Sequence, residues 1–206
     1  MNNINTKISG RQIRRSAFIF VSLAFLSATA FLSGCDKSDP VPVNENELIT
    51  TLTLSYLKVE QDGEPVAAEP VVFSWRDADG PGPGAPVVDD VILDANATYE
   101  MTITLLDESK TPAENISDEI LQEDEEHQFF FSVSGIDAIV MYNDEDGNAK
   151  PIGLQNTFQT GAAGTGTLGV ILRHEPDKNG TGVESGNPAN AGGETDLEVS
   201  FPATIQ

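Results

Sequence analysis

Apolar and polar residues alternate with a period of two along most of the chain beyond residue 47. Between Leu48 and Val59, for example, Leu52, Leu54 and Tyr56 share one face and the intervening Thr and Ser residues share the other. Such alternation, rich in β-branched and aromatic residues and bounded by turn residues, is typical of half-buried β-strands. It predicts about nine strands: Leu48–Val59, Val71–Trp75, Val87–Leu93, Tyr99–Leu106, Gln128–Val133, Ala138–Tyr142, Leu154–Phe158, Thr167–Arg173 and Leu197–Phe201.

Short strands separated by Gly, Pro, Asn and Asp turns predict an all-β fold, an antiparallel immunoglobulin-like β-sandwich with one short helix. The helix is expected after Thr111, because Thr111, Pro112 and Glu114 fit a capping box with proline at the first helical position. Ile116 and Ile120, four residues apart, would lay this helix across one end of the sandwich. Residues 178–193, rich in Gly, Asn, Ser and Ala, are expected to form a long loop before the last strand.

The first 34 residues have the pattern of a signal peptide. They carry four basic residues and no acid, and an uncharged run from Ser16 to Leu32 is shorter than the roughly 20 residues of a spanning helix. The run ends in Leu-Ser-Gly-Cys at positions 32–35, which closely resembles a bacterial lipobox. That resemblance implies cleavage before Cys35 and attachment of acyl chains to it, whereas a secretory signal with an incidental cysteine is the alternative. Residues 35–46 then form a lipidated, proline-containing tether, and residues 47–206 form the β-sandwich domain.

Composition limits the classes of function. The formal net charge is −22, and the basic residues of the leader would be lost on cleavage, so the remaining surface repels nucleic acid. Such a surface favours cations, basic partners or simple solubility. Cys35 is the only cysteine, which excludes an internal disulfide and a cysteine-based zinc site. No Gly-x-Ser-x-Gly motif or other catalytic constellation is present, so we expect no enzyme activity.

The two histidines are the first candidate site. His127 shares its parity with Phe129 and Phe131, and His174 shares its parity with Leu172, so each continues a row that faces the core. One begins its strand and the other ends its strand, so antiparallel pairing would bring both imidazoles to the same end of the sandwich. Imidazoles with nearby carboxylates are ligands for zinc, copper or other transition metals, and two imidazoles also suit haem iron. The alternative is a structural pair that is hydrogen-bonded to neighbouring carboxylates.

Two Asp-Gly segments are the second candidate site. Asp77 and Asp79 precede Gly80, and Asp144 and Asp146 precede a glycine in the same way. Acids two apart followed by glycine let carboxylates converge on a hard cation, which predicts calcium binding. Neither segment has a complete EF-hand loop, and Asp and Gly are equally typical of hairpin turns.

Three stretches, residues 124–131, residues 165–178 and residues 190–198, resemble a family of small lipoproteins from Gram-negative bacteria. Members are often labelled "type 1 periplasmic-binding fold" and are often encoded beside TonB-dependent receptors. The resemblance implies an outer-membrane lipoprotein, periplasmic or surface-exposed, that assists a TonB-dependent receptor in taking up a nutrient, metal or haem. The label names two α/β lobes, whereas a chain with one predicted helix fits the β-sandwich better. A structural or adhesive surface module without a small-molecule ligand is the alternative function.

Overall fold

The computed structural model describes residues 47–60, 63–66, 69–80 and 82–206. The described residues, from Glu47 to Gln206, belong to one compact unit. The predicted signal peptide, Cys35 and the tether lie outside the described residues and stay predictions. In the described ranges, no helix is long and apolar enough to cross a membrane.

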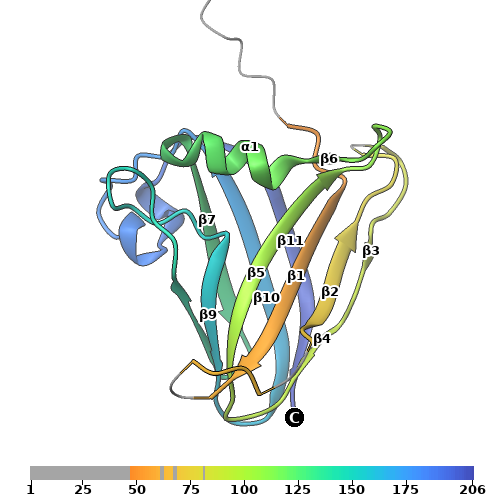
Figure 1. The fold of residues 1–206 in the computed structure, drawn as a ribbon, viewed down its shortest axis with the longest axis vertical. Helices are drawn as coiled ribbons and strands as arrows, with labels where there is room; N and C mark the ends of the chain where they lie inside the picture. The colour runs from red at the N-terminus through yellow and green to blue at the C-terminus, as the bar shows by residue number, and fades with distance from the viewer. Residues whose placement is uncertain (1–46, 61–62, 67–68, 81) are drawn as a thin grey trace, which may run out of the picture. The chain divides into compact units, whose positions relative to one another are not determined.

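The described strands form two sheets that face each other (Figure 1). The first sheet runs in the order β3 (Val87–Val88), β2 (Val71–Arg76), β1 (Thr51–Val59), β5 (Thr98–Asp107), β9 (Gln155–Thr160) and β8 (Ala138–Tyr142), with β6 (Glu114–Asn115) paired to β5. The second runs in the order β4 (Val91–Leu93), β11 (Glu194–Ile205), β10 (Gly164–His174) and β7 (His127–Ser134). Neighbours within these sheets are antiparallel apart from β4 and β11. The predicted all-β sandwich is confirmed.

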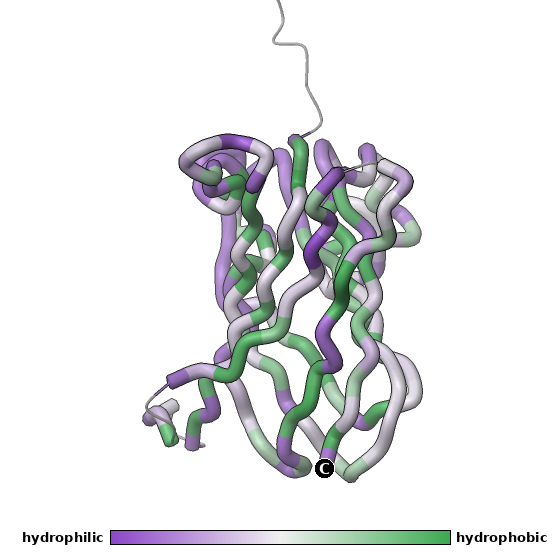
Figure 2. Tube along the Cα trace, turned by 90° about the vertical axis from the view of Figure 1, so that its right-hand side faces the viewer, coloured by the Kyte–Doolittle hydropathy of each residue, from purple (hydrophilic) through white to green (hydrophobic). Residues whose placement is uncertain are grey.

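The core lies between the sheets and is built by the alternation read from the sequence (Figure 2). On β5, Met101, Ile103 and Leu105 are buried, whereas Thr102 between the first two is exposed. Phe158 of β9 packs edge-on against Tyr56 of β1, with ring centroids 5.4 Å apart. Burial of these side chains supplies most of the driving force for folding, because no disulfide is available to the chain.

The helix α1 (Ile116–Gln122) closes one end of the sandwich and begins later than predicted (Figure 1). Asn115 is its N-cap, and its side-chain oxygen accepts a hydrogen bond from the backbone N–H of Ser117. Glu114 cannot serve as the third residue of a helix, because Glu114 and Asn115 pair with β5 as β6. Ile116 and Ile120 are buried as predicted. A short 3₁₀ turn, η1 (Asp124–Glu126), links α1 to β7.

The predicted strand Val87–Leu93 is two strands in different sheets. Val87 and Val88 belong to β3 in the first sheet, and Val91 to Leu93 form β4 in the second. Asp89 lies at the crossing, where one carboxylate oxygen accepts hydrogen bonds from the backbone N–H and the hydroxyl of Ser74 at 2.8 and 2.9 Å. These bonds hold the chain on the first sheet up to the point where it crosses.

The loop 178–193 contains two 3₁₀ turns, η2 (Val183–Ser185) and η3 (Pro188–Asn190), and covers the outer face of β7 and β10. Phe130 of β7 points away from the main core and is buried against Val183 and Ala191 of this loop. Gln128 adds a hydrogen bond from its side-chain amide to the carbonyl of Val183, at 3.0 Å. Both faces of β7 are therefore buried from His127 to Phe130, which leaves His127 little freedom to move.

Replacing Phe158 with alanine should remove a central contact of the core. We expect Phe158→Ala to lower the free energy of unfolding by about 3–5 kcal/mol, because the aromatic transfer energy is lost and a cavity is left. Phe158→Leu, which keeps most of the volume, should cost no more than about 1.5 kcal/mol. Urea unfolding of both variants tests this, and equal losses would argue against a tightly packed ring at this position.

Candidate metal site

Pairing of β7 with β10 brings the two histidines together. In the antiparallel register His127 lies directly opposite His174, as Phe129 lies opposite Leu172. Their rings are stacked, with centroids 4.5 Å apart and planes 29° from parallel. His127 is completely buried and His174 is 5% exposed. The predicted convergence of the two imidazoles at one end of the sandwich is confirmed, whereas metal binding by them stays a prediction.

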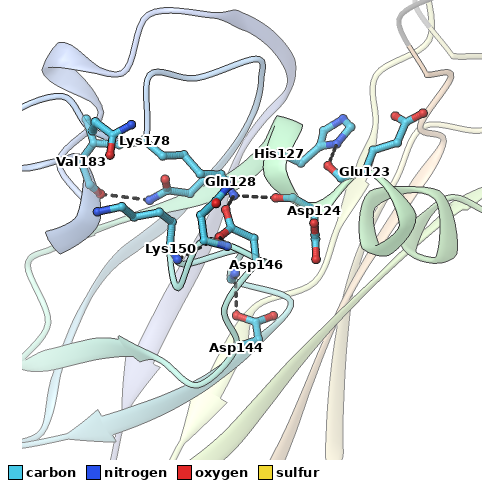
Figure 3. Close-up of polar contacts among 12 residues, drawn as sticks. Glu123, Asp124, His127, Gln128, Asp144, Asp146, Lys150, Lys178 and Val183 are labelled. Carbon is cyan, nitrogen blue, oxygen red and sulfur yellow. Dashed lines mark hydrogen bonds and ion pairs between the residues drawn. The ribbon is translucent and has the colours of Figure 1, made fainter. Parts of the chain in front are cut away.

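A backbone hydrogen bond sets the orientation of the His127 ring (Figure 3). Its Nδ1 lies 3.1 Å from the carbonyl oxygen of Glu123, the residue that ends α1. A carbonyl can only accept, so Nδ1 carries the proton and Nε2 of the neutral ring keeps a lone pair. Metal-binding histidines are commonly oriented in this way, with the second nitrogen donating to a carbonyl or carboxylate.

The lone pair of His127 Nε2 faces Asp196 on β11. The distance from Nε2 to Oδ2 of Asp196 is 3.9 Å, and the Asp196 side chain is only 1% exposed. Neither carboxylate oxygen of Asp196 has a hydrogen-bond partner, and His127 Nε2 has none either. Three buried acceptor atoms thus lie together without a donor between them, an arrangement that is unfavourable unless a cation or proton is shared.

A β-bulge explains why Asp196 points inward. Leu197 pairs with Leu172 and Thr195 pairs with Arg173, so Asp196 is the extra residue on β11. A bulge places two consecutive residues against one on the partner strand and redirects the side chains around it. Strict alternation from the buried Leu197 would send Asp196 to the outer face. This is why sequence reasoning missed it, and the bulge left no recognisable signal in the sequence.

Burial shifts the pKa values of these groups toward their neutral forms. Burial lowers the pKa of His127 below its ordinary value, which favours the neutral ring. Burial also raises the pKa of Asp196, although the neighbouring His174 opposes the shift. Glu47, at the start of the described domain, has a pKa raised to about 7, first by burial and then by repulsion from Glu119, Asp196, Glu123 and Glu114. The end of the sandwich therefore carries excess negative potential.

Three overlapping groups of potential ligands form around the histidine pair. His127, His174 and Asp196 each offer a ligand atom within 4.8 Å of the others, and this group is the most buried. Glu47 and Glu123 form a second group with His127. Glu126 and Glu175, both exposed, form a third group with His174, and Glu126 Oε2 lies 3.6 Å from His174 Nε2. The carboxylates provide negative charge at the outer side of the site, where a cation would approach.

The predicted calcium ligands are not brought together in this way. Both carboxylate oxygens of Asp144 accept backbone hydrogen bonds, from Gly153 at 2.7 Å and from Gln155 at 2.9 Å. Asp79 accepts one from the backbone of Gly84, and a buried oxygen of Asp77 has no partner. Within the described part of the chain, these aspartates and Asp146 belong to none of the three ligand groups. The geometry favours the turn alternative for both segments.

Asp146 instead forms a buried ion pair with Lys178. The Lys178 ammonium donates to Asp146 Oδ2 at 2.9 Å and to the carbonyl of Asp124 at 2.5 Å (Figure 3). The two side chains are 6% and 1% exposed. The pair joins the start of the loop 178–193 to the β8–β9 connection and to η1, so it supports the backbone that precedes His127.

Comparisons with protein-family models, with curated proteins and with solved structures find no match to this chain. Function must therefore be inferred from the chemistry of the chain's own residues. Two imidazoles and a carboxylate whose side chains are almost entirely buried can hold a transition-metal ion.

Acid should weaken the contribution of the Asp146–Lys178 pair to the stability of the fold. Burial by itself would raise the pKa of Asp146, but hydrogen bonds from Lys178 and from the backbone of Lys150 and Asn148 outweigh it and lower this pKa. The stabilisation is then fully present above the unfolded value of about 3.9 and is lost as the pH falls through the lower folded pKa. Asp146→Asn should cost about 3 kcal/mol of unfolding free energy at neutral pH, because Lys178 would be left as an unpaired buried charge.

Urea unfolding between pH 3 and 7 measures this effect. The difference in unfolding free energy between the wild type and Asp146→Asn should shrink below about pH 4. Asp90→Asn removes an exposed carboxylate and serves as the control. A difference that stays constant down to pH 3 would contradict the assigned ion pair.

Proposed function

We propose that this chain is a non-enzymatic, lipid-anchored protein of the cell envelope whose β-sandwich binds one divalent transition-metal ion through His127, His174 and Asp196. The observation that carries the proposal is the set of three buried acceptor atoms, His127 Nε2 and both oxygens of Asp196, that have no hydrogen-bond partner. A metal ion accepts electron pairs from all of these ligand types and would neutralise the carboxylate.

The donor set suits zinc or copper. Nitrogen and oxygen donors about 2.1 Å from a tetrahedral ion lie about 3.4 Å from one another. His127 Nε2 and Asp196 Oδ2 are 3.9 Å apart, so a shift of about half an ångström closes this pair. Three protein ligands leave one position open, as in zinc sites that exchange a ligand. The stacked rings, 4.5 Å apart and buried, leave no room for a porphyrin between them, which argues for an ion over haem.

The place in the envelope is supported by the sequence. Leu-Ser-Gly-Cys at positions 32–35 resembles a lipobox, and a proline-containing tether follows it. The acidic surface favours the approach of cations and basic partners. The resemblance to lipoproteins encoded beside TonB-dependent receptors suggests that the ion, once bound, is passed to such a receptor at the outer membrane. The exposed Glu126 and Glu175 beside His174 would serve as the route by which the ion enters and leaves.

Zinc or copper should bind with one ion per chain and should raise the thermal midpoint. Asp196→Asn should weaken binding at least tenfold, since it removes the charged ligand, and a His127→Ala/His174→Ala variant should abolish binding. Without metal, Asp196→Asn should stabilise the domain by about 1 kcal/mol, because it removes an unpaired buried charge. Calorimetric titration and chemical unfolding of the same samples measure these two opposite effects.

Asp90→Asn is the matched control and should change neither the metal affinity nor the unfolding free energy of the metal-free protein. If no zinc or copper binds to the wild type, the metal proposal is wrong and the structural or adhesive function becomes the working one. If metal binds but Asp196→Asn also destabilises the metal-free protein, the aspartate has a structural role that this geometry does not explain.

Lipid attachment is tested separately. Cys35→Ser should abolish incorporation of labelled palmitate and should shift the protein from the membrane fraction to the soluble fraction, because Cys35 supplies the only thiol in the chain. Wild-type protein that carries no label would favour the plain secretory signal.

A further inference from the structure

The strand β8 leaves one edge of the first sheet open. It is the last strand in the order of that sheet and, among the described strands, pairs only with β9, without a bulge. Its five residues, Ala138 to Tyr142, include no charged residue and no proline, although 21% of the whole chain is charged. Ile139 and Met141 are 54% and 40% exposed. Soluble proteins usually protect an edge strand with charge, proline or a bulge, and β8 has none of these.

The other edges of the two sheets are better protected. β3 and β4 have only two and three residues, and Asp89, Asp90 and Asp94 flank them. On β7, the backbone N–H of Phe129 donates to the carbonyl of Ile152 at 2.7 Å, so the segment before β9 covers the first half of that edge. In the described part of the chain, β8 is therefore the strand of more than three residues whose edge is open along its whole length.

Hydrogen bonds at the two ends of the β8–β9 ladder identify the backbone groups that face outward. The N–H of Asn143 donates to the carbonyl of Gln155 at 2.9 Å, and the N–H of Gly161 donates to the carbonyl of Asp137 at 2.7 Å. Because the direction of hydrogen bonding alternates along an antiparallel strand, the odd-numbered residues of β8 bond to β9. The even-numbered residues direct their N–H and carbonyl groups to the open edge, and these are Ala138, Val140 and Tyr142.

The open edge is complementary to itself when a second copy of β8 runs antiparallel to it. With Val140 opposite Val140 of the second copy, Ala138 lies opposite Tyr142, and about six backbone hydrogen bonds can form. Ile139 then lies opposite Met141 of the second copy on the outer face. Side chains at such positions, which lack mutual hydrogen bonds, are the closest pairs of an antiparallel ladder. The two exposed apolar side chains of each strand would therefore cover those of the other.

The charges that flank β8 favour the same register. It sets Asp137 opposite Asn143 of the second copy and Asp144 opposite Ile136, so no acidic residue faces another. A register centred on Met141 would instead set Asp137 opposite Glu145, where like charges repel. The flanking residues thus select the register in which all five residues of β8 are paired.

We propose that two copies of this chain associate through β8, so that their first sheets form one continuous sheet across a two-fold axis. Each copy contributes the same surface, which is the usual arrangement of a homodimer. The paired surface is small, and we expect a dissociation constant of about 100 μM. The net charge of −22 opposes association, so salt should strengthen the dimer. The pairing does not depend on the proposed metal site.

The test uses a soluble chain from Asp36 to Gln206, which retains every described residue and lacks the native cysteine. Sedimentation equilibrium between about 10 μM and 1 mM protein, without metal, measures the association. Met141→Glu should weaken the dimer at least tenfold, because the carboxylate would be buried against Ile139 of the second copy. Ile92→Glu is the matched control on the exposed side of β4 and should change the affinity by less than twofold. Raising sodium chloride from about 50 to about 500 mM should strengthen the wild-type dimer at least threefold.

Cysteine cross-linking tests the register. A mixture of Ile139→Cys and Met141→Cys chains should form disulfide-linked dimers with oxidised glutathione, because the two thiols lie opposite each other across the pair. Either variant alone should give at least fivefold less linked dimer, since each thiol would face an unchanged side chain.

The outcomes separate this inference from the metal proposal. A wild type that stays monomeric at about 1 mM overturns the inference, and so do equal losses in Met141→Glu and Ile92→Glu. Cross-linking of Ile139→Cys alone at the yield of the mixture also overturns it, because the register would be wrong. Circular dichroism confirms that each variant is folded. Met141→Glu should bind zinc as the wild type does, so loss of the dimer leaves the metal proposal standing, and loss of metal binding leaves the dimer.

Discussion

The antiparallel pairing of β7 with β10 is the interaction on which the rest of this end of the molecule depends. It places His127 opposite His174, and the same register aligns Phe129 with Leu172 in the core. Because the side chains of a strand alternate between its two faces, a slip of β7 by one residue would turn His127 and Phe129 away from the core face. The position of the imidazoles is therefore held by the same apolar contacts that stabilise the sandwich.

Burial on both faces of the first half of β7, His127 to Phe130, makes this arrangement rigid. The loop 178–193 covers Phe130 on the outer face, and the Asp146–Lys178 pair secures the start of that loop. Rigid support is what a binding site needs, since ligands must be held close to their working geometry. The unpaired acceptors of His127 and Asp196 are unfavourable for stability, and such exceptions to otherwise consistent packing are typical of functional sites.

Part of the site was predictable from residue order alone. The parity of His127 with Phe129, and of His174 with Leu172, placed both rings in core-facing rows at matching strand ends. Asp196 was not predictable, because a bulge on β11 reverses the side that alternation assigns to it. The calcium prediction depended on spacing alone, and spacing does not reveal that the oxygens of Asp144 and Asp146 accept hydrogen bonds from the following backbone and, for Asp146, from Lys178.

The sequence by itself determined the fold class and the positions of most strands, because the period-two pattern is a local consequence of burying one face of a strand. It also determined the lipobox-like segment that ends at Cys35. Only the tertiary structure decided that the segment Val87–Leu93 divides between two sheets, that Asp196 lies beside both histidines and that Glu47 lies beside His127. These features depend on contacts between residues far apart in the chain and on an irregular register, and neither leaves a periodic trace in the sequence.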